Sequence, residues 1–184
     1  DAGAIALGVT QGTAFKLYSI AADGSSTREV LAEGPFCRGA DLSENGRVFA
    51  CAGSTTQFPR ELFAGTLLSK RLTRLTYSNP ELDTVKLGKQ EAIKWTAKDG
   101  TQLEGVLTYP VGYVAGTRYP LAVLPHGGPE GVSVLTWNTR STYPAQVFAN
   151  AGYFVFEPNY RGSSGRGSAF AKADHKDLGG KEFQ

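Results

Sequence analysis

The sequence predicts a mixed fold, in which an antiparallel β-sheet region is followed by a mostly parallel α/β sheet. Up to about residue 77, short apolar or alternating runs are separated by turn residues, as in antiparallel strands. In residues 91–184, a strand pattern, a helix pattern and a second strand pattern follow one another, as in an α/β sheet. The polar residues 78–90 show neither period, so we place a linker between residues 1–77 and 91–184.

The first half contains strand-like runs joined by residues that suit tight hairpins. Asp23-Gly24 and Asn45-Gly46 tolerate the positive φ angles of such turns. The runs around Asn45-Gly46 make a four-strand unit that ends near Thr76 and resembles one β-propeller blade, preceded by part of another. An antiparallel sandwich fits the periodicity equally well, but the α/β half that follows favours the propeller. The clearest runs are residues 5–9, 15–20, 47–51 and 62–67.

The second half opens with a predicted hairpin and a buried strand. Residues 92–96 and 103–109 flank Lys98-Asp99-Gly100, which is a hairpin signal. Residues 119–125 then form a continuous apolar run, which predicts a strand buried on both faces.

A helix and another strand complete this unit. The spacing of Ala145, Phe148 and Ala149 predicts a helix between about residues 141 and 151, which Gly152 would end in a left-handed conformation. Residues 153–157 return to a strand pattern, so the succession predicts a crossover unit of a parallel sheet. We expect residues 153–157 to form the edge of the part of the sheet that this chain contains.

Composition and charge exclude several classes of partner. The chain of 184 residues has 41% hydrophobic residues and a net charge of +2, with lysine and arginine scattered, so it reads as a globular protein without a nucleic-acid surface. No apolar run approaches the ~20 residues that cross a bilayer, so we expect no membrane partner and a soluble protein, and we favour the cytoplasm. The chain has no methionine and begins at Asp1, which we interpret as an interior segment.

The two cysteines lack the spacing of a zinc site, and no metal or cofactor is expected. We favour buried free thiols for Cys37 and Cys51. Both lie in predicted neighbouring strands, so a single disulfide stays geometrically conceivable, although the sequence does not fix the strand register.

The first candidate site follows the strand at residues 119–125 and includes His126, Gly127, Gly128 and Pro129. In α/β hydrolases a loop of this His-Gly-Gly type contributes an N–H group to the oxyanion hole, which stabilises the tetrahedral intermediate. A tight turn between two prolines is the alternative, and the preceding strand favours the oxyanion role. We assign His126 no proton transfer, because a histidine at a strand end is more often an orienting hydrogen-bond partner.

A second glycine-rich loop, residues 158–167, follows the next strand at the same edge of the sheet. Its pattern fits neither phosphate-binding nor dinucleotide-binding loops. Ser163, Ser164 and Ser168 lie outside any Gly-x-Ser-x-Gly sequence, so none is a good nucleophile. Arg161 either contacts substrate or, as we favour, pins the loop to a neighbouring acid.

The last segment contains Asp177, which we expect to cap a helix that starts near Gly179, and His175, which we expect on the solvated surface.

The motifs His126-Gly-Gly-Pro129, Asn159-Tyr-Arg-Gly-Ser-Ser-Gly-Arg-Gly167 and Asp177-Leu-Gly-Gly-Lys-Glu-Phe-Gln184, in this order behind a blade-like unit, resemble the prolyl oligopeptidase family of serine peptidases. The branch resembled is that of acylaminoacyl and dipeptidyl peptidases. The resemblance implies the C-terminal blades of a β-propeller followed by the N-terminal part of an α/β-hydrolase domain that acts on oligopeptides or acylated peptides through an acyl-enzyme. It implies that the Gly128 N–H is an oxyanion donor and that His126 stands where other branches carry a tyrosine.

The family's Ser-Asp-His triad would follow Gln184, so we assign no triad residue and expect this chain alone to be inactive. The expected partners are a peptide substrate and the remainder of the same enzyme, with homo-oligomer formation left open. An esterase of the same fold and a non-catalytic binding module are the alternatives. Neither exopeptidase nor endopeptidase specificity can be read from these residues.

Overall fold

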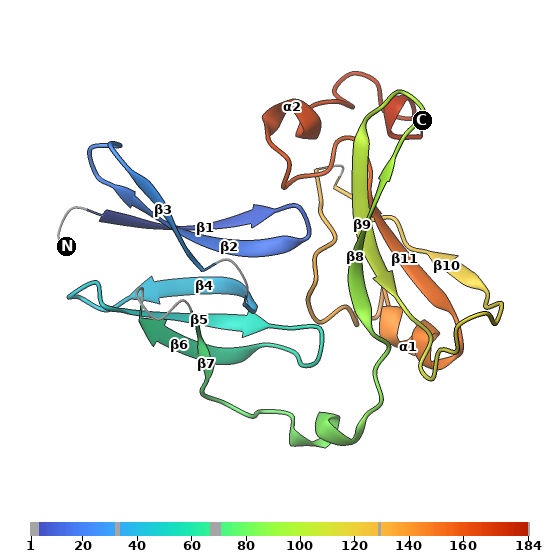
Figure 1. Cartoon of the computed structure of the whole chain (residues 1–184), viewed down its shortest axis with the longest axis horizontal. Helices are drawn as coiled ribbons and strands as arrows, with labels where there is room; N and C mark the ends of the chain where they lie inside the picture. The colour runs from blue at the N-terminus through green and yellow to red at the C-terminus, as the bar shows by residue number, and fades with distance from the viewer. Residues whose placement is uncertain (1–3, 32–33, 67–70, 129, 184) are drawn as a thin grey trace.

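The structure is a computed structural model that describes residues 4–31, 34–66, 71–128 and 130–183, and these residues form three sheets. Two antiparallel sheets lie one above the other, and the third sheet stands beside them (Figure 1). No helix within the described ranges is long and apolar enough to cross a lipid bilayer.

The first two sheets are built from hairpins, as the alternating pattern predicts. The first has the order β1-β2-β3 and the second β4-β5-β6-β7, with antiparallel pairing throughout. Gly24 and Gly46 have φ angles of 74° and 65°, which is the positive φ expected at these turns. The strands are β1 Ala4–Gln11, β2 Ala14–Ala21, β3 Thr27–Leu31, β4 Phe36–Leu42, β5 Val48–Ser54, β6 Glu61–Thr66 and β7 Thr73–Arg74. Leu67, at the end of one predicted run, lies outside the described residues.

One apolar core joins these two sheets. Its buried members come from β2 to β6 and include Phe15, Leu17, Phe49 and Phe63. Burying such side chains contributes about 1.5–3 kcal/mol each, so the two sheets stabilise one another.

The preference for free thiols was wrong, because the structure joins Cys37 and Cys51 in a disulfide. Their Cα atoms lie 5.7 Å apart on the adjacent strands β4 and β5. A register shift between Arg38 and Ala40 sets which residues of the two strands face each other. Such a bulge inserts a residue in one strand only, and the alternating pattern gives no sign of it.

The third sheet has the order β10-β11-β9-β8, in which β10 and β11 are parallel and the other pairs antiparallel. The expectation of a mostly parallel sheet is therefore wrong for the described residues, because the β8–β9 hairpin adds its strands in antiparallel orientation. Its strands are β8 Gln90–Thr96, β9 Gln102–Thr108, β10 Leu121–Val123 and β11 Phe154–Asn159. The short helix α1, Ala145–Asn150, packs against β9 and β11 with Ala145 and Ala149 fully buried. The linker region contains one 3-10 helix, η1, Pro80–Thr84.

Two further expectations for this sheet were wrong. The strand at residues 119–125 is shortened to β10, with Leu121 and Val123 57% and 52% exposed, because Pro120 and Pro125 bracket it and it pairs on one side only. The edge is therefore β10, and β11 lies inside the sheet.

Helix α1 is also shorter than predicted, since Pro144 occupies its N-cap and Arg140 and Tyr143 form an isolated bridge before it. Gly152 has a φ of 88°, as expected of the residue that ends the helix.

The chain ends in short helical turns, α2 Ser168–Ala171 and η2 Lys181–Phe183. The helix expected near Gly179 is only the single 3-10 turn η2. Asp177 precedes it and accepts a hydrogen bond from the Lys181 N–H at 3.3 Å, so the acid still serves an N-terminal backbone group.

The two halves of the chain contact one another mainly through the β1–β2 turn. The Gly12 N–H donates to the Gly165 carbonyl at 2.8 Å, and the Thr13 carbonyl accepts from the Leu135 N–H at 2.8 Å. Ser54 and Thr136 share a hydroxyl hydrogen bond of 2.5 Å. The Gly12 contact holds the β1–β2 turn against the glycine-rich loop at residues 158–167, and the other two reach the segment between β10 and α1.

Glu61, at the start of β6, holds the segment from β7 into the linker in place through hydrogen bonds. Its buried carboxylate accepts hydrogen bonds from the Arg74 guanidinium at 3.0 Å, from the Ser78 N–H at 2.8 Å and from the Thr76 hydroxyl. These donors, that of Thr76 first, lower the pKa of Glu61 to about 2.

We predict that Glu61→Gln destabilises the chain at pH 7 and that the difference from the unaltered chain shrinks as pH falls from about 4.5 to about 2. The reason is that a carboxylate with a lowered pKa stabilises the fold above its unfolded-state pKa, and this contribution is lost as it protonates. Urea unfolding across this pH range measures the effect, with exposed Glu44→Gln as the control. An equal response of the two variants would contradict the prediction.

Candidate functional site

Two loops meet at one edge of the third sheet. One runs from β10 to α1 and contains His126, Gly127 and Gly128, and the other follows β11 and is the glycine-rich loop. Because β10 and β11 are parallel, their carboxyl ends lie at the same edge, where α/β sheets place their sites. Pro129, quoted with the first motif, lies outside the described residues.

Asn159, the last residue of β11, fixes the first loop. Its Oδ1 accepts a hydrogen bond from the Ser133 N–H at 2.7 Å, and its Nδ2 donates to the Ser133 carbonyl at 2.8 Å. The side chain is 1% exposed, so both backbone groups of Ser133 are satisfied away from water. Sequence reasoning quoted Asn159 within a motif but missed this contact.

Further contacts join the two loops along their length. The Ser164 N–H donates to the Gly131 carbonyl at 3.0 Å, and the Ser164 hydroxyl donates to the Glu130 carbonyl. Together with the Asn159 contact, these bonds make the two loops one unit.

His126 is held by residues of the second loop. Its ring stacks on Tyr160 with the centroids 4.6 Å apart, and the Tyr160 hydroxyl donates to the His126 carbonyl. Nε2 lies 2.9 Å from the Ser163 hydroxyl, and Nδ1 lies 3.1 Å from the Gly127 carbonyl. Burial lowers the pKa of His126, which favours the neutral ring.

The His126–Ser163 contact has the atoms of a base and a nucleophile but not their arrangement. The Gly127 carbonyl can only accept, so Nδ1 carries the proton and Nε2 accepts from the Ser163 hydroxyl. Ser163 is 0% exposed, which keeps its oxygen from an incoming substrate. The pair therefore orients His126, in line with the orienting role that we expected.

Gly127 and Gly128 are both exposed to solvent. Gly128 has a φ of 139°, and a Cβ atom there would lie 2.6 Å from the Gly131 nitrogen, so only glycine fits. No atom lies within 4 Å of a Cβ at Gly127. Within the described part of the chain, neither amide donates a hydrogen bond, and both are available to a ligand.

Arg161 makes the contact expected of a loop-pinning residue. Its Nη2 lies 2.6 Å from Oδ2 of Asp99, in the turn between β8 and β9, and its Nη1 donates to the Lys181 carbonyl at 3.3 Å. The side chain is buried, and this ion pair ties the second loop to the β8–β9 hairpin.

A cavity of about 770 Å³ lies beside His126 and Gly127. Its walls come from the first loop, from Glu157 of β11 and from residues of β4, β5 and the turn before β6. Both halves of the chain therefore enclose the space next to Gly127.

Glu157 is the buried acid of this cavity. Its carboxylate is 7% exposed and accepts a hydrogen bond from Asn138 Nδ2 at 2.8 Å. Burial raises its pKa to about 7, which the Asn138 hydrogen bond and the charge of Arg140 only partly offset. Sequence reasoning placed Glu157 in a buried strand without a role. Its alternation with the buried Val155 and Asn159 was the available signal.

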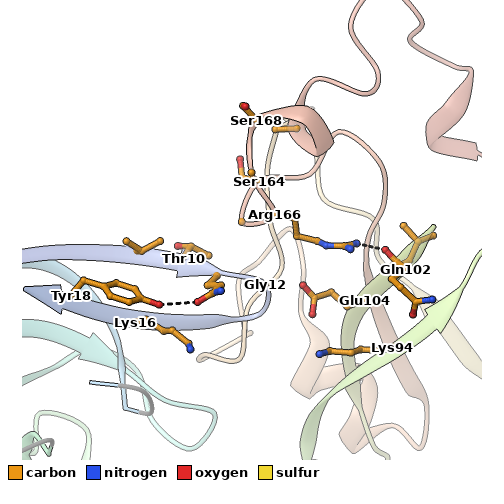
Figure 2. A pocket seen from close by; sticks show the side chains of 16 residues that line it. Thr10, Gly12, Lys16, Tyr18, Lys94, Gln102, Glu104, Ser164, Arg166 and Ser168 are labelled. Atoms are coloured by element: carbon orange, nitrogen blue, oxygen red, sulfur yellow. Dashed lines mark hydrogen bonds between the residues drawn. The ribbon is translucent and has the colours of Figure 1, made fainter. Parts of the chain in front are cut away.

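A second cavity, of about 1030 Å³, separates the β1–β2 hairpin from β8 and β9 (Figure 2). Lys94 and Glu104 lie on the sheet side, and Arg166 reaches from the second loop to the Gln102 carbonyl. None of the described residues of the first loop lines it. The smaller cavity is thus the better candidate site, because Gly127 and His126 line it.

Residues 138–184 match the model of the prolyl oligopeptidase family. The predicted resemblance is confirmed. The matched segment begins at Asn138 and includes β11, the glycine-rich loop and the last motif, whereas Gly127 and Gly128 lie before it.

Relatives of the prolyl oligopeptidase family align over much of the chain. A probable dipeptidyl-peptidase 5 of Emericella nidulans is 32% identical over 134 residues, covering 65% of this chain and 18% of that protein. The structure of Pyrococcus horikoshii acylaminoacyl peptidase has a TM-score of 0.78 at 23% identity, covering 98% of this chain and 27% of that one. An acylaminoacyl peptidase in complex with Z-Gly-Gly-Phe-chloromethyl ketone has a TM-score of 0.79 at 23% identity, covering 99% and 27%. These structures show the fold, and the chain spans 18% to 27% of the three proteins.

We predict that Asn159→Leu lowers the free energy of unfolding by at least about 2 kcal/mol, because both backbone groups of Ser133 lose their buried partner. Urea unfolding gives the value. Asn150→Ala, at an exposed position of α1, is the control and should change stability by less than about 0.5 kcal/mol. Equal effects of the two changes would show that the Asn159 contact is not a stabilising one.

Proposed function

We propose that this chain supplies the oxyanion loop of a serine peptidase that cleaves oligopeptides or acylated peptides through an acyl-enzyme. The amides of Gly127 and Gly128, which follow β10 and donate no hydrogen bond to a described residue, carry the proposal, and Gly127 lines a cavity. On this reading, residues 1–77 are β-propeller blade strands, residues 78–90 a linker and residues 91–184 the first part of an α/β-hydrolase domain.

The proposed reaction depends on N–H donors whose positions are fixed before the substrate reacts. When a peptide carbonyl is attacked, its oxygen gains negative charge, and amides already aimed at that position stabilise it without reorganisation. Gly128 is the assigned donor, while its φ angle and the loop contacts hold its backbone in place. His126 orients the loop through its contacts with Tyr160 and Ser163 and transfers no proton.

The nucleophile belongs to the remainder of the complete protein in this proposal. The chain has no Gly-x-Ser-x-Gly sequence, and Ser163, the one described serine that contacts a histidine, is buried. Peptide substrates are supported by the names of the relatives and by the peptide chloromethyl ketone bound to one of them. Arg161 has a structural role here, because Asp99 already occupies its guanidinium.

We predict that Gly128→Pro in the complete protein lowers kcat by about 10²-fold or more, since proline removes the N–H donor. Hydrolysis of an acyl-amino-acid anilide measures it, with circular dichroism to check the fold. Gly127→Pro, measured in parallel, tells which of the two amides stabilises the oxyanion. A folded Gly128→Pro enzyme with unchanged kcat would remove Gly128 from the site.

We also predict that the 184-residue chain alone hydrolyses neither anilides nor activated esters, because acyl transfer needs an activated nucleophile. The assay uses an acyl-amino-acid nitrophenyl ester, first with the chain alone and then with the complete protein. Ester but not anilide turnover by the complete protein would favour an esterase. No turnover of either would favour a binding module, and activity of the repurified chain that maps to one of its own serines would overturn the proposal.

A further inference from the structure

The cavity beside the glycine amides carries an excess of positive side chains. Three arginines line it, Arg38 from β4, Arg60 before β6 and Arg140 from the first loop. None of the three is in an ion pair within the described residues. Arg38 is positioned by Phe36, whose ring centroid lies 5.6 Å from the guanidinium carbon.

The negative charges of the acids in the cavity do not neutralise the positive charges of these arginines. Glu130 points to His175, with Oε1 and Nε2 3.0 Å apart at the solvated surface. Glu157 is buried, and Asn138 donates the one hydrogen bond that its carboxylate accepts from a described side chain. Arg140 is near enough to Glu157 for its charge to lower the pKa of that acid, whereas neither Arg38 nor Arg60 has an acidic partner among the described residues. Three guanidinium groups from three segments outnumber the acids of the cavity and favour an anion there.

We propose that this cavity binds a carboxylate of the peptide substrate, so that the protein prefers peptides with an acidic side chain near the bond that is cleaved. The proposal rests on the proposed function for its reference to cleavage, because Gly127 lies in the wall of the same cavity. A guanidinium matches a carboxylate in shape and charge, whereas a cationic side chain would be repelled by all three arginines.

Glu157 makes this binding depend on pH. The titratable groups that share the cavity with it are Arg38, Arg60, His126, Glu130, Arg140 and Tyr143. A bound carboxylate repels an ionised Glu157 and tolerates a protonated one, so binding takes up a proton. Burial raises the pKa of Glu157 to about 7, so affinity should fall as pH rises through this value. Burial lowers the pKa of His126, which favours its neutral ring.

Calorimetric titration of the 184-residue chain tests the proposal without turnover. The probes are blocked tripeptides, acetyl-Ala-Glu-Ala-amide and its Gln and Lys counterparts, at low salt. At pH 6.5 the Glu peptide should bind at least about 10-fold more tightly than the Gln peptide, because its carboxylate gains charged hydrogen bonds. Its affinity should fall at least about threefold by pH 8.5, while Glu157→Gln should abolish this pH dependence.

Arginine variants test which side chains bind the carboxylate of the Glu peptide. Arg38→Ala and Arg140→Ala should each lower the affinity for the Glu peptide about 10-fold and leave the Gln peptide unchanged. Arg118→Ala removes the same charge from an exposed position outside the cavity and should leave the affinity for both peptides unchanged. Circular dichroism checks that each variant is folded.

Equal affinity for Glu and Gln peptides, tighter binding of the Lys peptide, or no saturable binding would each overturn the proposal. So would equal losses in the Arg118 and Arg38 variants. Binding is measured on the 184-residue chain itself and does not depend on turnover. A complete protein without peptidase activity would therefore refute the proposed function but not the proposed carboxylate site.

Discussion

The buried amide of Asn159 is the contact on which the geometry of the site depends. It closes hydrogen bonds to both backbone groups of Ser133, 26 residues earlier in the chain. Leaving the N–H or the carbonyl of Ser133 unpaired would lower the free energy of unfolding by about 1–3 kcal/mol. The first loop is therefore most stable in the conformation that keeps Ser133 beside the end of β11. The position of the glycine amides follows from this conformation, through the neighbouring contacts of Ser164 and His126.

In this arrangement, the side chains that hold the two loops together are different groups from the backbone amides proposed to stabilise the oxyanion. Tyr160, Ser163 and Ser164 each use the side-chain hydroxyl to hold the first loop. The amides of Gly127 and Gly128, by contrast, donate to no described residue. Donors held in this way need no rearrangement when a negative charge appears beside them, which is how preorganised sites act.

The hairpins, the change of pattern near residue 78 and the two loops could be predicted because each depends on local residue order, as at Asn45-Gly46 and Gly152. The missed features depend on pairing between distant segments. The Cys37–Cys51 disulfide needed the register of β4 and β5, including its bulge. The exposure of Leu121 and Val123 needed the place of β10 in the sheet. For Asn159 and Glu157, the sequence indicated burial at most, and only the fold brought Ser133 and Asn138 to them.

The contacts of the β1–β2 turn imply a mechanical asymmetry. Gly12 and Thr13 bind the second half through single backbone hydrogen bonds, to Gly165 and from Leu135, whereas β1 pairs with β2, and β8 with β9, along the whole length of the strands. A net contribution of about 0.5–1.5 kcal/mol for each such bond is small beside the cooperative cost of parting a sheet. On heating, the contacts of the β1–β2 turn should therefore break before the sheets do. The two halves of the chain would then move relative to one another, and the volume of the cavity between them should vary more than the packed interior of either half.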